Sequence, residues 1–219
     1  MNYDKKGADY YSNIRLDLIN LIDKKSQNLK VLEIGAAYGE TLFYLKQNGI
    51  ASEVVGVDIF EDAKNKQNYK PLDQFIFGDI EKIDLPEYFQ HFDLILLADV
   101  LEHLFEPKSV LETLKKYLKE DGKIIISMPN IRYYSALYKI VFKGDFKYEE
   151  SGIFDYTHVR FYCRKNIQEL LETAGYKVLK QESSIINYQG KSIAKLINLI
   201  TLGIFEEFFS TQYFFVVKK

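Results

Sequence analysis

Short apolar runs alternate with segments of helical periodicity along most of this chain. Seven runs have the character of strands, and they cover residues 30–34, 53–58, 73–79, 92–99, 123–130, 176–182 and 212–219. Apolar residues at helical spacing predict helices between several of them, over residues 12–25, 39–48, 109–122 and 165–174. The runs at 92–99 and 123–130 are apolar at nearly every position, as strands covered on both faces must be. This alternation predicts an α/β fold with a doubly wound, largely parallel sheet.

Two segments break the alternation. Residues 129–163, which follow the fifth strand, are rich in aromatic and charged side chains, and residues 184–209 separate the last two strands. Both are long for connections within a compact domain, and long connections are often functional. We expect a single domain over residues 1–219, in which these two insertions either bind a substrate or pack on the surface.

Charge and composition argue against several classes of function. The formal net charge of −2 gives no support for a nucleic-acid surface, which needs clustered lysine and arginine. Cys163 is the single cysteine, so we expect neither an internal disulfide nor a cysteine-based zinc site. The most apolar stretch, residues 192–209, is interrupted by Lys195, Glu206 and Glu207 and does not resemble a membrane span. We expect a cytoplasmic protein without a nucleic-acid partner or a transmembrane segment, and peripheral membrane contact stays open.

A glycine-containing turn follows the first strand, in the arrangement Glu33-x-Gly35-x-x-x-Gly39. A dinucleotide site needs G-x-G-x-x-G, but Ala37 and Glu40 occupy the second and third glycine positions. Glu40 lies in the first turn of the predicted helix, where its charge would repel a bound pyrophosphate. S-adenosylmethionine has no phosphate, so a close backbone approach and a nearby carboxylate are enough for it. The turn therefore favours that cofactor over a dinucleotide.

Three further segments follow this turn in a matching order, and the chain as a whole resembles the class I S-adenosylmethionine-dependent methyltransferases. Asp58 ends the second strand, "GDIEKIDLP" follows the third, and "FDLILLADVLEHL" spans the fourth. The resemblance implies a Rossmann-like, seven-stranded sheet whose last strand is antiparallel, with a substrate-side insertion after the fifth strand. It also implies that S-adenosylmethionine contacts Tyr11, Glu33, Gly35, Ala37, Gly39, Asp58, Asp79, Ile80, Ala98 and Asp99. For Tyr11, packing of the predicted N-terminal helix is an equally good interpretation.

The insertion after the fifth strand carries a second, narrower resemblance. "MPN-R" and "F-x-G-x-F-x-Y-x-x-x-G-I-x-D-x-T-H-x-R-F" look like a group of methyltransferases found with bacterial glycosyltransferases and surface-polysaccharide enzymes. This resemblance implies a sugar or glycan acceptor that receives the methyl group on a hydroxyl. The candidate acceptor-binding residues are Asn130, Tyr133, Tyr156 and Arg160, and the candidate catalytic residues are His158, Asp155 and His103. His158 is either the general base, oriented by Asp155, or a structural residue of the insertion.

Several alternatives stay open. The Glu102-His103 pair, common among methyltransferases of small molecules, favours a quinone, a lipid or another small molecule as the acceptor. A non-catalytic domain that binds the cofactor and docks a partner through residues 184–209 is a further alternative. Asp99, Glu102 and His103 are not a specific metal signature, so we expect no metal ion. The pattern of residues leaves the oligomeric state undetermined.

Overall fold

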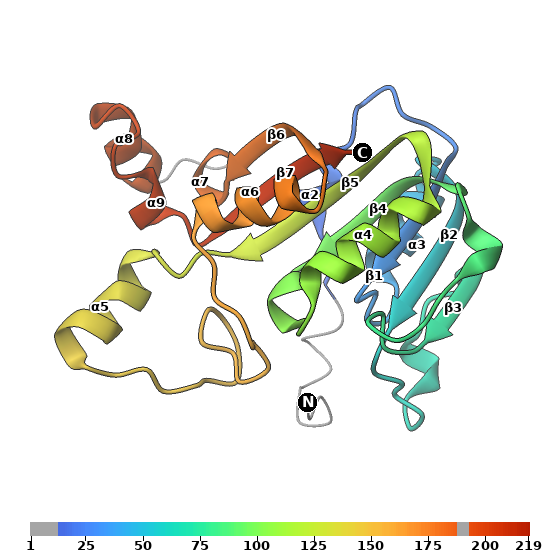
Figure 1. Ribbon diagram of the computed structural model, residues 1–219, viewed down its shortest axis with the longest axis horizontal. Helices are drawn as coiled ribbons and strands as arrows, with labels where there is room; N and C mark the ends of the chain where they lie inside the picture. Colours follow the sequence, from blue (N-terminus) through green and yellow to red (C-terminus); the bar gives the residue numbers. More distant parts are fainter. Residues whose placement is uncertain (1–12, 188–192) are drawn as a thin grey trace.

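A mixed sheet of seven strands is the centre of the computed structural model, which describes residues 13–187 and 193–219 (Figure 1). The strand order is β3-β2-β1-β4-β5-β7-β6. Strands β1 to β5 pair in parallel, and β7 runs antiparallel to both β5 and β6. This order confirms the predicted Rossmann-like sheet with an antiparallel last strand. The strands are β1 (Leu29–Ile34), β2 (Ala51–Asp58), β3 (Gln74–Phe77), β4 (Phe92–Ala98), β5 (Leu118–Pro129), β6 (Lys177–Ser183) and β7 (Gln212–Lys218).

Helices cover both faces of the sheet because successive strand residues point to opposite sides. On one face, Leu32 and Ile34 of β1 belong to the core that packs under α4 (Pro107–Tyr117) and α6 (Arg164–Thr173). On the other face, Val31 joins the core under α3 (Glu40–Gln47) and α2 (Leu16–Ile19). Figure 1 shows α4 and α6 in front of the sheet and α3 behind it. Two apolar cores therefore hold the sheet, as the fully apolar central strands predicted.

The two insertions supply the remaining helices. Residues 129–163 contain α5 (Tyr134–Lys143), and residues 184–209 contain α7 (Ser184–Asn187), α8 (Ile193–Ile200) and α9 (Glu206–Phe209). Arg132 forms an ion pair with Glu207, and the rings of Tyr134 and Phe209 lie 6.2 Å apart between centroids. Both insertions project from the end of the sheet where β5 stops (Figure 1). Three short 3₁₀ turns complete the described elements: η2 (Lys66–Asn68), η3 (Pro86–Tyr88) and η4 (Leu101–His103).

Two of the predicted helices differ from the structure. The helix expected over residues 12–25 is wrong: in its described part only Leu16–Ile19 is α-helical. Arg15 precedes it in a non-helical conformation, because its backbone amide donates to Thr41 and its side chain is held elsewhere in the fold. The helix expected over 109–122 ends at Tyr117. Leu118 is fully buried and pairs with Phe92 at the start of β5, so sheet pairing overrides the helical pattern there.

The helices of the second insertion are short. Across residues 13–187 and 193–219, every helix is either too short or too polar to span a bilayer.

Candidate active site

A cavity of about 820 Å³ opens at the carboxyl ends of β1, β2 and β4. The strand order reverses between β1 and β4, and ligands of open α/β sheets bind at such a switch point. The structure brings most of the predicted cofactor residues together there, from turns that are distant in sequence. Those that line the cavity are Glu33, Gly35, Ala37, Asp58, Asp79, Ile80, Ala98 and Asp99. Tyr11, with its neighbour Tyr10, lies outside the described residues.

Left-handed backbone conformations bring the main chain close to this cavity. Gly35 has φ of +73°, and the non-glycine residues Ala37 and Asp99 have φ of +51° and +55°. Such conformations cost energy in non-glycine residues and occur preferentially at functional sites. Gly39, with φ of +84°, does not line the cavity; it begins α3 and turns the chain into the helix. Gly39 therefore shapes the loop, and its contact with the cofactor stays a prediction.

Asp58, at the end of β2, holds the glycine-containing loop through a hydrogen bond from the loop's backbone. Its Oδ2 accepts the amide of Ala37 at 2.7 Å, and its Oδ1 accepts the amide of Phe60 at 2.9 Å. Burial raises the pKa of Asp58, while the amides of Phe60 and Ala37 act in the opposite direction. The carboxylate is thus fixed at the cavity wall, and its remaining lone pairs are the acceptors that a ribose diol needs.

Glu33 is a buried carboxyl group at the end of β1. Its side chain is almost inaccessible to solvent, and its Oε2 has no hydrogen-bond partner within the described residues. Burial raises the pKa of Glu33 to about 8; the charge of Asp58 acts in the same direction and that of Arg15 in the opposite one. A carboxyl group with this pKa is mostly neutral at pH 7.

The sequence analysis missed the charge network around Asp99. Arg15 donates to Asp99 at 2.8 Å and to Ser127 at 3.0 Å, and Gln212 also donates to Asp99. Burial opposes the charge on Arg15, but Asp99 and Asp17 outweigh it and raise the pKa of Arg15 above its ordinary value. Arg15 lies 84 residues from Asp99 and Gln212 lies 113 residues from it, so no local pattern could connect them.

A second cavity, of about 460 Å³, lies beside the first and shares Asp99, His103 and Gln212 with it. The insertion supplies much of its wall, including the predicted residues Tyr133, Asp155 and His158. The structure thus brings the three candidate catalytic residues to one cavity that adjoins the first. Asp155 accepts the amide and the hydroxyl of Thr157 at 2.9 and 2.7 Å, which fixes the loop before His158.

His103 lies on the wall between the two cavities. Its Nδ1 is 3.0 Å from the carbonyl oxygen of Thr157, and a carbonyl only accepts, so Nδ1 carries the proton. Burial, assisted by the neighbouring His158, lowers the pKa of His103 to about 4. The ring is therefore neutral at physiological pH, with its unprotonated nitrogen at Nε2.

Three of the predicted acceptor residues have other positions. The buried amide of Asn130 donates to the carbonyls of Glu207 and Ser210, each at 2.8 Å, which uses both of its N–H groups. The guanidinium of Arg160 donates to the carbonyls of Leu104 and Phe105. Neither residue lines the two cavities, nor does Tyr156. We therefore retain Tyr133 as a candidate acceptor contact and assign Asn130 and Arg160 to holding the insertion in place.

Comparison with known proteins agrees with this arrangement. An S-adenosylmethionine-dependent methyltransferase of Mesorhizobium loti matches with a TM-score of 0.65 and 14% identity, over 97% of this chain and 100% of that one. A second such enzyme, from Archaeoglobus fulgidus, matches with a TM-score of 0.63 and 21% identity, over 98% and 96% of the two chains. At these identities the matches establish the fold.

Proteins of similar sequence add to the comparison of structures. The ubiquinone biosynthesis O-methyltransferase of Glaesserella parasuis serovar 5 is 29% identical over 135 residues, 58% of this chain and 56% of the relative. The chain spans about half the length of the first such relatives that it matches. Fold and cavity thus define a protein of the methyltransferase class. A family model described as "Methyltransferase domain" matches residues 5–181, and the chain belongs to that family.

The raised pKa of Glu33 predicts that cofactor binding is coupled to the release of a proton. S-adenosylmethionine carries sulfonium and ammonium cations, which favour an ionised carboxylate and lower its pKa from about 8. We expect cofactor binding at pH 7 to release nearly one proton from Glu33. Calorimetry in buffers of different ionisation enthalpy measures this release. Glu33→Gln should abolish this proton release. Glu53→Gln, at the remote end of β2, is the control and should retain it. A binding enthalpy of the wild type that does not depend on the buffer would contradict the expectation.

Proposed function

We propose that this enzyme transfers the methyl group of S-adenosylmethionine to a hydroxyl oxygen of an aromatic acceptor of the quinone class. The observation that carries the proposal is the pair of adjoining cavities, which meet at Asp99, His103 and Gln212. The first has the cofactor residues, and the second has a tyrosine and two histidines on its wall. A methyl group passed from a cofactor in the first cavity to an acceptor in the second would cross at these shared residues.

The chemistry needs alignment and removal of one proton. The acceptor oxygen forms a bond to the methyl carbon, the C–S bond breaks, and its electron pair stays on sulfur to give S-adenosylhomocysteine. The hydroxyl proton must leave during this displacement, to a nearby base or to water. His158, which is buried on the wall of the second cavity, is our candidate for the group that assists this loss.

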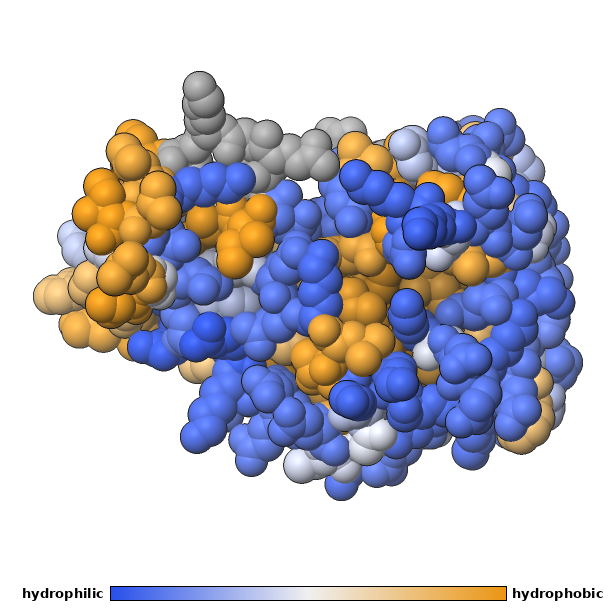
Figure 2. All heavy atoms as spheres, turned by 90° about the horizontal axis from the view of Figure 1, so that it is seen from above, coloured by the Kyte–Doolittle hydropathy of each residue, from blue (hydrophilic) through white to orange (hydrophobic). Residues whose placement is uncertain are grey.

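Two observations support a quinone-type acceptor over a sugar. Several relatives are ubiquinone biosynthesis O-methyltransferases, whereas the sugar acceptor rests on the narrower sequence resemblance alone. The two insertions also expose apolar side chains suited to a lipophilic acceptor or a lipid bilayer, on α5, which lines the second cavity, and on α8. Figure 2 shows apolar side chains exposed at the left end of the view, the end at which Figure 1 places both helices. On α5 and α8, the apolar side chains that are more than half exposed are Tyr134, Tyr138, Val141, Phe142, Ile193, Leu196, Leu199 and Ile200.

A sugar hydroxyl is the second candidate acceptor. The wall of the second cavity carries Lys139, Glu149 and Asp155 beside Tyr133, and such a mixture of charged groups and an aromatic ring suits a sugar. The exposed apolar side chains would then contact the lipid part of a lipid-linked glycan.

Product formation distinguishes the two acceptors. The enzyme is incubated with S-adenosylmethionine and either a catechol with a short prenyl tail or a set of nucleotide sugars, and methylated products are identified by mass spectrometry. We expect O-methylated catechol, formed faster when the prenyl catechol is presented in vesicles. Methylated sugar with no methylated catechol would overturn the quinone proposal in favour of the second candidate.

Binding of S-adenosylmethionine is tested separately, by substitution of Asp58. Asp58→Ala should weaken S-adenosylmethionine binding by about 1.5–3 kcal/mol, the usual worth of hydrogen bonds to a charged group. Asp58→Asn, which keeps one acceptor oxygen for the Ala37 amide, should have an intermediate effect. Titration calorimetry measures both, and wild-type affinity in the alanine variant would remove Asp58 from the cofactor site.

A further inference from the structure

Glu102 is a fully buried carboxyl group, and neither of its carboxylate oxygens has a hydrogen-bond partner within the described residues. It lies in η4, directly after β4, on the wall of the second cavity. Nε2 of His158 lies 3.9 Å from Oε1 of Glu102, which is too far for a hydrogen bond. Burying a carboxylate is costly unless it is paired or binds a metal ion, so this group indicates a ligand that the protein chain does not supply.

Two imidazole rings lie beside Glu102 in the arrangement that metal-binding histidines adopt. The rings of His103 and His158 are 4.7 Å apart between centroids. Nδ1 of His103 donates to the carbonyl of Thr157 and Nδ1 of His158 to that of Ile153, each at 3.0 Å. A proton on Nδ1 leaves the lone pair of a neutral imidazole on Nε2, and metal-binding histidines characteristically donate their other N–H to a carbonyl or carboxylate.

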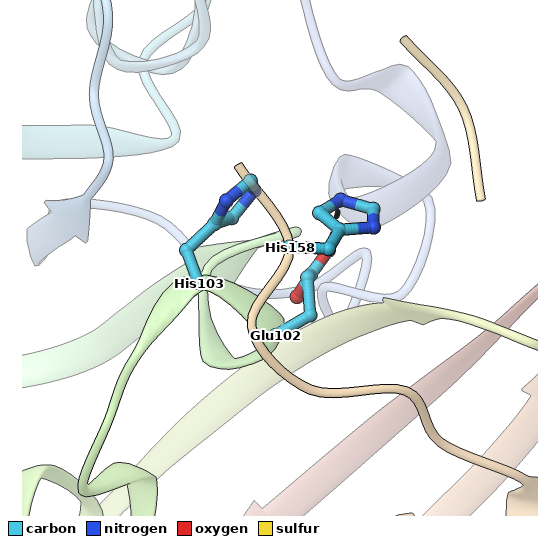
Figure 3. Close-up of side chains that lie close together, drawn as sticks. All are labelled: Glu102, His103 and His158. Carbon is cyan, nitrogen blue, oxygen red and sulfur yellow. Dashed lines mark ion pairs between the residues drawn. The ribbon is translucent and has the colours of Figure 1, made fainter. Parts of the chain in front are cut away.

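We propose that Glu102, His103 and His158 bind one divalent metal ion of the class that prefers imidazole with carboxylate, such as zinc. One potential ligand atom from each residue lies within 4.8 Å of the others, and Figure 3 shows the three side chains close together. Ligand atoms on one tetrahedral zinc ion are about 3.4 Å apart, so side-chain movements of about 1 Å close the site. Two histidines and one glutamate leave a coordination position for another ligand, as catalytic zinc sites do.

Backbone contacts hold the loop of His158 against the turn of Glu102. The amides of Val159 and Arg160 donate to the backbone carbonyl of Glu102, at 3.0 and 3.1 Å. The guanidinium of Arg160 donates to the carbonyls of Leu104 and Phe105 in the same turn. The distant ligand, His158, is thereby fixed relative to Glu102 and His103. The sequence analysis weighed Asp99, Glu102 and His103 as ligands and expected no metal ion, because these three residues are not a specific metal signature. It did not consider His158, which comes from another segment.

The position of the site indicates a use for the ion, and this use rests on the proposed O-methyl transfer. All three residues line the second cavity, and His103 also lines the first. An acceptor hydroxyl bound to the open position would lose its proton to water more readily, because the ion stabilises the oxyanion. The oxyanion would then attack the methyl carbon while the C–S bond breaks and its electron pair stays on sulfur. Metal binding itself does not depend on the identity of the acceptor.

Titration of the metal-free protein, residues 1–219, with zinc sulfate tests the proposal. We expect one ion per chain, and binding at least 30-fold weaker in Glu102→Gln and in His158→Ala. His91→Ala is the matched control: His91 lies just before β4, pairs with Glu53, and lines neither cavity, so its loss should leave the affinity unchanged. Circular dichroism and S-adenosylhomocysteine binding confirm that each variant is folded.

Cobalt(II) gives a second measurement that does not depend on activity. Visible absorption of a tetrahedral cobalt site should appear in the wild type and in His91→Ala, and should be absent in His158→Ala. Equal zinc affinity in His158→Ala and His91→Ala, or less than 0.2 ion per chain in the wild type, would overturn the proposal. A stoichiometric metal ion without O-methylation of any catechol or sugar would instead refute the proposed function and leave the metal site standing.

Discussion

Gly35→Val should abolish S-adenosylmethionine binding, with Kd rising at least 100-fold, while the sheet remains folded. Gly35 has φ of +73°, which a β-branched residue adopts only under strain. A Cβ at this position would lie 2.9 Å from Cγ2 of Val100, whose side chain is buried on the cavity wall. The side chain would either displace Val100 or push the loop into the space of the cofactor. Calorimetry with S-adenosylmethionine measures the loss.

Gly49→Val is the matched control for this experiment. Gly49 also has a positive φ, +68°, but a Cβ there would meet no atom within 4 Å, and the residue does not line the cofactor cavity. This variant carries the same backbone strain without the clash. We expect a lower melting temperature and unchanged cofactor affinity. If Gly35→Val binds the cofactor as the wild type does, the glycine loop does not contact the cofactor.

His158→Ala should lower kcat by about 10²–10⁴-fold, the usual worth of a group that assists proton removal from a hydroxyl. The side chain is buried on the wall of the second cavity and lies outside the lining of the first. The dissociation constant of S-adenosylmethionine should therefore change less than threefold. Single-turnover kinetics with the acceptor identified by product analysis measure the chemical step apart from binding.

His91→Ala serves as the control for this variant as well, because it removes a histidine from the opposite end of β4. Turnover within a factor of two of the wild type is expected there. His158→Ala with more than half of the wild-type kcat would assign His158 a structural role, and His103 and Asp99 would become the candidates for assisting proton loss. Loss of cofactor binding in His158→Ala would instead place the residue in the first cavity.

The sequence by itself determined the sheet and the cofactor side of the site. Short apolar runs, and central strands that are apolar at nearly every position, are local patterns that can be detected in a sequence. Glu33, Gly35, Asp58 and Asp99 lie at the carboxyl ends of β1, β2 and β4 or directly after them, and parallel strands bring these ends to one edge. That geometric rule is why eight of the ten residues predicted as cofactor contacts line the first cavity.

Only the tertiary structure decided the contacts between distant segments around the two cavities. Arg15 reaches Asp99 across 84 residues, and the loop of His158 is held to Glu102 because amides of this loop donate to a carbonyl 57 and 58 residues earlier. Such contacts join irregular segments, which carry no periodicity and whose side chains can point either way. The same limitation made Asn130 look like an acceptor contact, although its amide holds the second insertion. Burial decided the protonation of Glu33 and His103 too, since desolvation depends on what packs around a group and not on its neighbours in sequence.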